Sequence, residues 1–300
     1  MEKQELLFLH LGKTAETALK GAKWERIREA KELRFSVNRP IQAVYRGCSE
    51  FLSKNGTPCL PTEKREFFSS EEIQDVFLSL CERSVHSYKQ EVCQGYLTIE
   101  GGYRAGICGT AVYEKGEIVH VKDISSINLR LPHEVKGCAD TVLKVVGTEK
   151  LKGILIIGPP GSGKTTLLRD LARQLGNGQK HLCIVDERME IAGMSHGFPG
   201  FDLGISCDVL NGYKKCDGIL FAVRSMAPDL ILCDEFGDEK DLRACFHAMK
   251  CGVVMVATMH AENEQELREK DIFRAMWQKH IFHWLVTLGR DCQVADIREI

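Results

Sequence analysis

Residues 158–165 read GPPGSGKT and match the phosphate-binding pattern GxxxxGK[ST] at every fixed position. In such a loop, glycines let backbone N–H groups turn toward phosphate oxygens. Lys164 reaches the β- and γ-phosphates, and the Thr165 hydroxyl can ligate Mg²⁺ at the positive end of a helix. The pattern therefore predicts a nucleotide site with Mg²⁺. The expected nucleotide contacts are Gly158, Pro159, Pro160, Gly161, Ser162, Gly163, Lys164, Thr165 and Thr166.

The elements that must position this loop are visible on both sides of it. Residues 153–157 form a short apolar, partly β-branched run that is typical of a buried parallel strand. Residues 166–173 have the apolar spacing of a helix. A glycine-rich turn without a ligand is the alternative, but the strand–loop–helix order is the context that the phosphate-binding pattern requires.

Three further apolar runs end in polar residues. They cover residues 181–185, 230–233 and 253–257, and they alternate with helix-like segments. This alternation predicts an α/β fold with a mostly parallel sheet flanked by helices. In open α/β sheets, ligands bind at the carboxyl ends of the strands. One crevice beside the phosphate loop is therefore expected to collect all three sets of polar residues.

The pair Asp234-Glu235 follows four apolar residues and matches the Walker B pattern. In that pattern the aspartate holds the Mg²⁺ shell, and the neighbouring carboxylate orients or deprotonates water. Asp234 is therefore predicted to be a Mg²⁺ ligand together with Thr165, and Glu235 is predicted to be catalytic. An acidic pair that ends a strand is otherwise solvated or caps a helix.

The other two polar sets leave alternatives open. Asp186 and Glu187, with Arg188 and Glu190, form either a second acidic contribution to the site or a charged loop. His260 either donates a hydrogen bond to the γ-phosphate or is an ordinary core or capping histidine. The glycine-rich loop from 193 to 218 is either a moving functional segment or a poorly ordered connection.

Composition narrows the class of protein. The chain has 300 residues, of which 44% are hydrophobic and 27% are charged, so we expect a large core. Its formal charge of -2 gives no net attraction to nucleic acid. Its 13 cysteines include no CxxC pair and no zinc pattern, so free thiols in a reducing compartment are expected. No signal peptide or transmembrane segment is expected, because no apolar stretch approaches 18 residues.

The first half of the chain has a different pattern. Helical spacing over 5–30 precedes two strands at 34–37 and 41–45, and Ser69 with Glu72 predicts a capped helix. Four further strands are expected at 96–100, 103–113, 117–122 and 127–131, followed by a helix over 134–146. We therefore expect a smaller mixed α+β domain over 1–131 and the P-loop domain over 132–300.

Several longer motifs resemble one known family across nearly the whole chain. They are IEGGYRAGICG at 99–109, ISSINLR at 124–130, GPPGSGKTT at 158–166, VDERMEIAG at 185–193, VRSMAPDLILCDEFGD at 223–238 and ATMHAEN at 257–263. The family is that of stage III sporulation protein AA, which is related to the ATPases of type II and type IV secretion systems.

The resemblance implies a RecA-like ATPase core behind an N-terminal regulatory or docking domain. It implies ATP and Mg²⁺ as ligands, a homo-oligomeric ring that is expected to be a hexamer, and nucleotide bound between the domains. The residues Asp186, Glu187 and Glu190 match the acidic box of secretion ATPases, and His260 matches the histidine box. Arg104 and Arg130 match N-domain arginines placed to meet phosphates. It also implies a place on the mother-cell cytoplasmic side, peripheral to a membrane channel complex.

Two departures limit this resemblance. Secretion ATPases usually carry Gly-Glu where this chain has Asp234-Glu235, and the four-cysteine zinc insertion of some branches is absent. The expected function is that of an ATP-hydrolysing motor of a secretion-like sporulation complex. The alternatives are an interaction subunit locked by nucleotide with little turnover, and a RecA-like nucleic-acid motor.

Overall fold

A computed structural model of the chain describes residues 3–62, 67–194, 196–290 and 292–300. The chain divides into two compact units. The first comprises Met1–His133 with Gly193–Gly200, and the second comprises Glu134–Ala192 with Phe201–Ile300. This division follows His133. The roles that the sequence predicts for domains 1–131 and 132–300 stay predictions.

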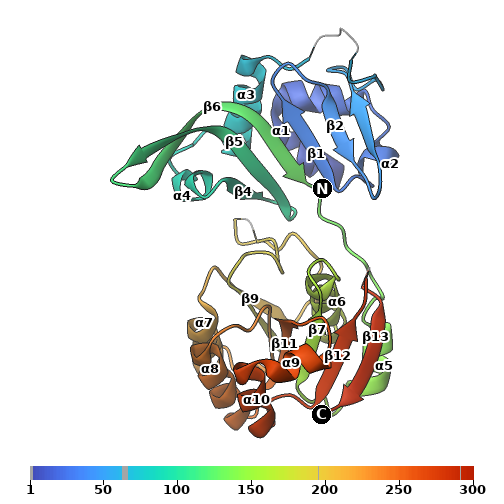
Figure 1. The fold of residues 1–300 in the computed structure, drawn as a ribbon, viewed down its shortest axis with the longest axis vertical. Coiled ribbons are helices and arrows are strands. Elements are labelled where there is room, and N and C mark those ends of the chain that lie inside the picture. Colours follow the sequence, from blue (N-terminus) through green and yellow to red (C-terminus); the bar gives the residue numbers. More distant parts are fainter. Residues whose placement is uncertain (1–2, 63–66, 195, 291) are drawn as a thin grey trace. The chain divides into compact units, whose positions relative to one another are not determined.

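The first unit is built on a six-stranded antiparallel sheet in the order β3-β2-β1-β6-β5-β4 (Figure 1). Helices α1 and α3 pack against each other, and α3 and α4 pack on strand β6. The elements are α1 (Lys3–Lys20), α2 (Trp24–Ile27), β1 (Glu32–Ser36), β2 (Ile41–Val44), β3 (Ser49–Leu52), α3 (Ser70–Leu80), α4 (Lys89–Cys93), β4 (Tyr96–Ile99), β5 (Tyr103–Glu114) and β6 (Glu117–Arg130).

Local capping explains where α3 begins. The Glu72 backbone N–H donates to the Ser69 hydroxyl, and the Glu72 carboxylate accepts from the Ser69 N–H at 3.0 Å. Both donors at the helix start are thereby satisfied. The predicted capping box is confirmed, and α3 buries the apolar stripe that includes Ile73, Val76 and Phe77.

The expectation of separate strands at 117–122 and 127–131 is wrong, because β6 runs without a break from Glu117 to Arg130. The register against β5 shifts between Cys108 and Thr110, and Asp123 has a φ of 50°. A bulge at this point absorbs the extra residues and lets the strand continue.

The second unit is built on a seven-stranded sheet in the order β13-β12-β7-β11-β10-β8-β9. Every neighbouring pair is parallel except β12 with β13. The elements are α5 (Asp140–Val146), β7 (Ile154–Gly158), α6 (Lys164–Gly176), β8 (Leu182–Asp186), β9 (Cys207–Asn211), α7 (Lys215–Ser225), β10 (Leu230–Cys233), α8 (Glu239–Lys250), β11 (Val254–His260), α9 (Glu264–Glu269), α10 (Asp271–Gln278), β12 (Trp284–Leu288) and β13 (Val294–Glu299).

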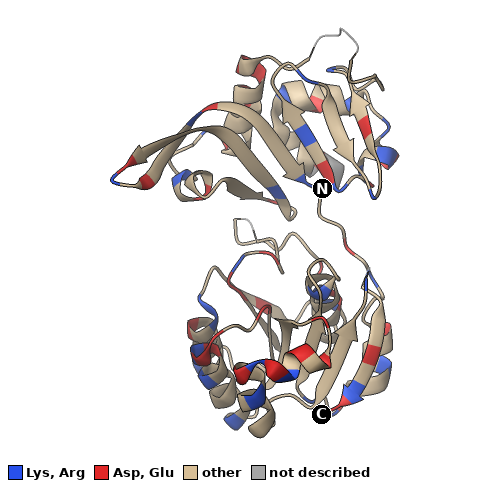
Figure 2. Ribbon diagram, in the orientation of Figure 1, with Lys and Arg blue, Asp and Glu red and all other residues tan. Residues whose placement is uncertain are grey.

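Strands β7, β8 and β10 are buried along their whole length, as strands covered by helices on both faces must be. One apolar cluster joins alternate residues of these strands and β11 to helices α7, α8 and α10. Helix α6 packs on β7, β8 and β11. Helices α8, α9 and α10 carry residues of both charges on their outer faces (Figure 2).

Two expectations for this unit need correction. The helix expected over 134–146 forms only from Asp140, because Gly137 has a φ of 86° and residues 134–139 take other contacts. The loop expected from 193 to 218 contains strand β9 and the first turn of α7. Strand β9 pairs with the edge of β8, and that tertiary pairing has little signature in the sequence CDVLN.

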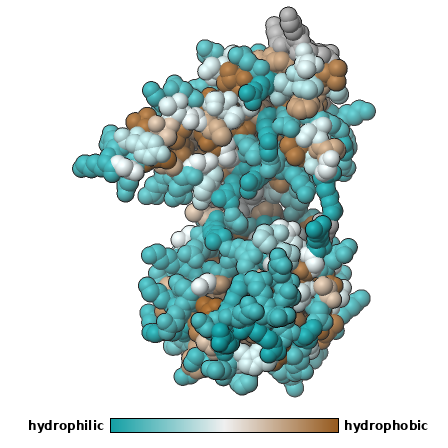
Figure 3. Space-filling model, in the orientation of Figure 1, coloured by the Kyte–Doolittle hydropathy of each residue, from teal (hydrophilic) through white to brown (hydrophobic). Residues whose placement is uncertain are grey.

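Among the residues that the structure describes, no helix is long and apolar enough to cross a membrane. The face of the second unit that Figure 3 displays is mostly hydrophilic.

Candidate nucleotide-binding site

The phosphate loop connects the buried strand β7 to helix α6, as its sequence context predicts. Gly161 and Gly163 have φ values of 72° and 98°, which side chains other than glycine rarely adopt. A Cβ on Gly163 would also lie 2.9 Å from the Cβ of Cys292. The glycines therefore provide both the turn and the close approach that bring backbone N–H groups to the start of α6.

Lys164 is 7% exposed, and its ammonium group lies within the loop. Its Nζ donates to the carbonyl oxygens of Gly158 at 2.7 Å and Pro159 at 2.9 Å. Burial lowers the pKa of Lys164, and the charge of Glu235 opposes this effect. The hydroxyl of Ser162 is buried and finds no hydrogen-bond partner within the described part of the chain. The loop thus holds a cation and an unsatisfied hydroxyl where phosphate oxygens would lie.

The carboxyl ends of β7, β10 and β11 meet beside this loop. His260 lies opposite Gly158 in the β7–β11 register. The Glu235 backbone N–H donates to the Thr258 hydroxyl at 2.8 Å, and the His260 Nε2 lies 3.6 Å from the Glu235 Oε1. Glu235 itself has a φ of 38°. The structure therefore brings the first glycine of the loop, Glu235 and His260 together at one sheet edge.

Asp234 precedes Glu235 and is 3% exposed. One of its carboxylate oxygens, Oδ1, has no hydrogen-bond partner in the described residues. Burial, followed by the charge of Asp186, raises the pKa of Asp234 to about 6, although Lys215 acts in the opposite direction. A buried carboxylate in this state is stabilised by a cation.

Asp186 is fully buried, but unlike that of Asp234 its carboxylate has several hydrogen-bond donors. Its carboxylate accepts from the backbone N–H groups of Glu190 at 2.9 Å, Ile191 at 3.0 Å and Ala192 at 2.8 Å. Burial still raises the pKa of Asp186 in spite of these three bonds. Arg169 of α6 donates to the carbonyl oxygens of Glu190 and Ile191, both at 2.9 Å. Asp186 therefore holds the loop that carries Glu190 in place.

Glu187 contacts Lys215, which lies in the segment 193–218 that the sequence predicts to be a loop. The Nζ of Lys215 lies 3.5 Å from the Glu187 carboxylate and donates to the Glu235 carbonyl oxygen at 2.9 Å. Lys215 is only 6% exposed, whereas its neighbour Lys214 is exposed. Sequence alone does not distinguish these two lysines, because burial depends on where α7 begins. Arg188, which the sequence places in the same charged segment as Glu187, pairs with the Glu235 carboxylate.

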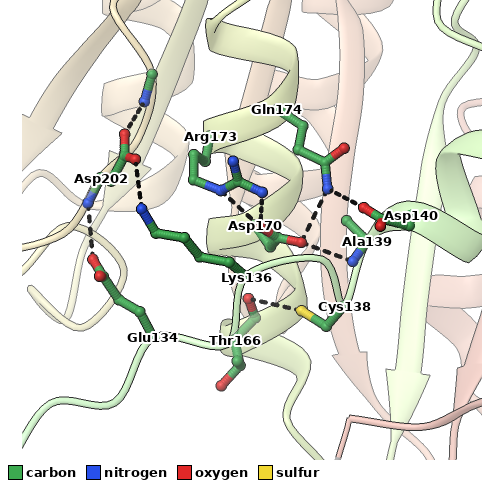
Figure 4. A network of polar contacts seen from close by, with 11 residues as sticks. Glu134, Lys136, Cys138, Ala139, Asp140, Thr166, Asp170, Arg173, Gln174 and Asp202 are labelled. Atoms are coloured by element: carbon green, nitrogen blue, oxygen red, sulfur yellow. Dashed lines mark hydrogen bonds and ion pairs between the residues drawn. The ribbon is translucent and has the colours of Figure 1, made fainter.

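A network of polar contacts fixes α6 to the segment before α5 (Figure 4). The Asp170 carboxylate accepts from the Ala139 N–H at 2.9 Å and from the Arg173 side chain at 2.6 and 2.8 Å. The Gln174 amide joins Asp170 to Asp140. The first turns of α6, and hence the phosphate loop, are thereby held to residues 138–140.

Arg104 and Arg130 belong to the first unit, where they are cross-strand neighbours on β5 and β6. The Arg104 guanidinium lies 4.0 Å from the centre of the Tyr96 ring, and Arg130 lies 3.7 Å from Glu32. Their role toward a nucleotide in the second unit stays a prediction.

The residues present fit a nucleotide with Mg²⁺. Among the described residues, no group of three His, Cys, Asp or Glu side chains could hold a metal by itself. Mg²⁺ is commonly held by one or two protein groups together with substrate phosphates, and it retains waters. The buried Asp234 oxygen, which has no hydrogen-bond partner within the described part of the chain, and the half-buried Thr165 at the start of α6 suit that mode.

A family model and a sequence comparison with known proteins both match this chain to one protein family. A model of the family described as sporulation stage III, protein AA, matches residues 1–300. Stage III sporulation protein AA of Bacillus subtilis is 33% identical over 267 residues, which are 87% of this chain and 83% of that protein.

Two solved structures share the fold. The ATPase DotB of Legionella pneumophila has a TM-score of 0.56 at 18% identity, covering 87% of this chain and 72% of that one. The pilus retraction motor PilT with bound ADP has a TM-score of 0.58 at 17% identity, covering 88% and 76%.

Proposed function

This chain belongs to the sporulation stage III protein AA family, and on that premise we propose that it is a Mg²⁺-dependent ATPase with a RecA-like core. Its output is mechanical work on a membrane-associated, secretion-like sporulation complex, on the cytoplasmic side of the mother cell. The working form is a homo-oligomeric ring, with the hexamer as the expected state. Structural similarity to an ATPase and to a pilus retraction motor supports this proposal.

The observation that carries the proposal is that the phosphate loop, Glu235 and His260 meet at one edge of the sheet. Lys164 and the backbone of residues 158–166 bind the phosphates, and Thr165 with Asp234 holds Mg²⁺. When bound, Mg²⁺ neutralises charge on the phosphate oxygens. Glu235 orients and deprotonates the attacking water, and His260 donates to the γ-phosphate from its place opposite Gly158.

Glu235 is the preferred base because of its position. Its carboxylate lies beside His260 and influences the pKa of Lys164, whereas the Glu187 carboxylate faces Lys215. Glu187 and Glu190 then act as the acidic box that shapes the neighbouring loop. Arg104 and Arg130 supply cations from the first unit when the two units, or two subunits, come together on the nucleotide.

The test combines two measurements. The mass in solution is measured with and without ATP and Mg²⁺, and ATP turnover is measured with and without Mg²⁺. We expect a ring of six chains and turnover that requires Mg²⁺. Lys164→Ala should lose nearly all nucleotide binding, because it removes the cation that faces the β- and γ-phosphates. Unchanged turnover in this variant would contradict the site.

The other functions are separate outcomes of the same experiment. Tight ATP binding without turnover, alone and with membrane partners, would favour a nucleotide-locked interaction subunit. Salt-dependent binding to DNA that stimulates turnover would favour a nucleic-acid motor.

A further inference from the structure

Two cysteines from distant parts of the chain lie on the first turn of α6. The Cys292 thiol donates to the Gly163 carbonyl oxygen at 3.5 Å, and the Cys138 thiol donates to the Thr166 carbonyl oxygen at 3.8 Å. Both side chains are half-buried. The two thiols therefore contact the phosphate loop and the turn that follows it.

Each thiol has a firm support. The Cys292 backbone N–H donates to the Ser162 carbonyl oxygen at 2.8 Å, and the absence of a Cβ on Gly163 permits this close approach. Cys138 precedes Ala139, whose N–H is held by Asp170 in the network of Figure 4. The cysteines are thus fixed to the same helix turn from two sides.

The two thiols also interact with each other. Both sulfurs lie against the same turn of α6, at the carbonyl oxygens of Gly163 and Thr166, and each thiol shifts the pKa of the other: Cys138 lowers that of Cys292, and Cys292 raises that of Cys138. An N–H at the start of α6, from Leu167, also lowers the pKa of Cys292. Thiolates that form at helix N-termini beside a donor are the reactive ones. We therefore expect Cys292 to be the thiol that attacks first and Cys138 to be the thiol that resolves the mixed disulfide.

We propose that Cys138 and Cys292 form a modification site that closes to a disulfide by exchange with a small disulfide such as glutathione disulfide. The Cys292 thiolate attacks one sulfur of the reagent, forming a mixed disulfide and releasing one glutathione thiolate, which takes up a proton. Cys138 then loses its proton and attacks the Cys292 sulfur, and the second glutathione leaves as a thiolate. The pair is oxidised by two electrons, and the reagent is reduced to two thiols.

Closure has a consequence for the phosphate loop. A bond between residues 138 and 292 would hold the segment at 292 against Gly163 and restrict the first turn of α6. The loop N–H groups could then adjust less to phosphate oxygens. We expect roughly tenfold weaker binding of nucleotide in the oxidised protein, which corresponds to about 1.4 kcal/mol. This part of the inference rests on the proposed nucleotide site, but formation of the disulfide does not.

The experiment uses the full chain, incubated with glutathione disulfide and then treated with an alkylating reagent that blocks the remaining thiols. Peptide mass spectrometry maps the 138–292 disulfide, and binding of a fluorescent ATP analogue is measured before oxidation, after it, and after reduction by dithiothreitol. We expect the mapped disulfide, a roughly tenfold loss of affinity, and full recovery.

Matched variants separate this pair from the other cysteines. Cys138→Ser should retain nucleotide binding in the oxidising reagent, because no intramolecular disulfide can form. Cys251→Ser removes an exposed cysteine on another part of the unit and should leave the effect intact.

Three results would overturn the inference. These are the absence of a 138–292 disulfide while other cysteines are modified, an equal loss of binding in Cys138→Ser, and a mapped disulfide with unchanged affinity. If the reduced protein binds no nucleotide, the proposed function fails, and disulfide mapping alone then decides the modification site.

Discussion

The pairs Asp186-Glu187 and Asp234-Glu235 have the same sequence and follow neighbouring parallel strands, yet they are built differently. Val185 and Cys233 lie opposite each other in the β8–β10 register, so the two pairs begin at the same level of the sheet. The Asp186 carboxylate accepts hydrogen bonds from three backbone N–H groups, whereas Asp234 keeps a buried oxygen without a partner in the described residues. Hydrogen-bond status therefore distinguishes two aspartates that share the same local sequence.

The glutamates differ in the partners that they face. Glu187 faces the buried ammonium group of Lys215, whereas Glu235 faces Arg188 and His260 at the edge beside the phosphate loop. Asp186 stabilises a loop, whereas Asp234 keeps an oxygen available for a ligand. An aspartate at the end of a strand becomes a candidate ligand when its surroundings leave one of its oxygens without a partner, as at Asp234 within the described residues.

The largest expected effect concerns the two glutamates. Glu235→Gln should lower ATP turnover by roughly 10²–10⁴-fold with nucleotide binding retained, because the amide keeps the shape of the side chain and cannot accept a proton. Glu187→Gln is the matched control and should retain most of the turnover. Turnover at saturating ATP and binding of a fluorescent analogue measure the two effects. The reverse ranking would assign the base to the pair on β8.

Lys215 joins the two pairs, and its removal should affect both. Lys215→Met leaves the carboxylates around it without their buried cation, and we expect a loss of about 3 kcal/mol in the free energy of unfolding. Lys214→Met, one residue away and exposed, should change it by less than about 0.5 kcal/mol. Urea unfolding of both variants checks this. Equal stabilities would mean that the Lys215 contacts contribute little.

The aspartates test hydrogen-bond status directly. Asp186→Asn should cost about 1–3 kcal/mol, because an amide group would face N–H donors that need an acceptor. Asp234→Asn should cost less than Asp186→Asn at neutral pH, because burial disfavours the charge that it removes and the Asp234 Oδ1 has no hydrogen-bond partner within the described residues. Urea unfolding without nucleotide measures both, and similar losses in the two variants would contradict the comparison.

The same two variants predict a pH dependence. The pKa of Asp234 is about 6, above its ordinary value of 3.8. At Asp234 the folded state therefore binds more protons than the unfolded chain across this window, so the contribution of this residue to stability falls as the pH rises from about 4 to 6. Asp234→Asn should remove this contribution. The pKa of Asp186 is also raised, so the contribution of that residue should remain.

The smallest expected effect comes from the other unit. If Arg104 or Arg130 meets the γ-phosphate, Arg104→Ala or Arg130→Ala should lower turnover at least tenfold, about 1.4 kcal/mol, with little change in ADP affinity. ADP lacks the phosphate that these arginines would contact. Thermal melting checks that the variants fold. Wild-type turnover in both single variants and the double variant would leave the first unit as a docking module.

Sequence predicted the elements whose causes are local. The strand before the phosphate loop and the helix after it follow from apolar spacing, and the capping box at Ser69 follows from two residues three apart. The meeting of Gly158, Glu235 and His260 was also predictable, because parallel strands present their carboxyl ends at one edge.

Features that depend on tertiary contacts could not be predicted in this way. Strand β9 exists through pairing with β8, and the start of α5 depends on Gly137 and on Asp170 of another helix. The burial of Lys215 depends on how α7 packs. The relation of Arg104 and Arg130 to the nucleotide depends on how two units come together, which no local pattern encodes.

The hydrogen bonds of Lys164 affect the affinity of the site for nucleotide. Its ammonium group already has two oxygen acceptors in the loop itself, the carbonyls of Gly158 and Pro159. When a nucleotide binds, its phosphate oxygens therefore compete with these two carbonyl oxygens for the Lys164 ammonium group. The affinity reflects the difference between two sets of contacts and not the full strength of one. Tighter binding can accordingly arise from weakening the internal competitor, without any new contact to the nucleotide.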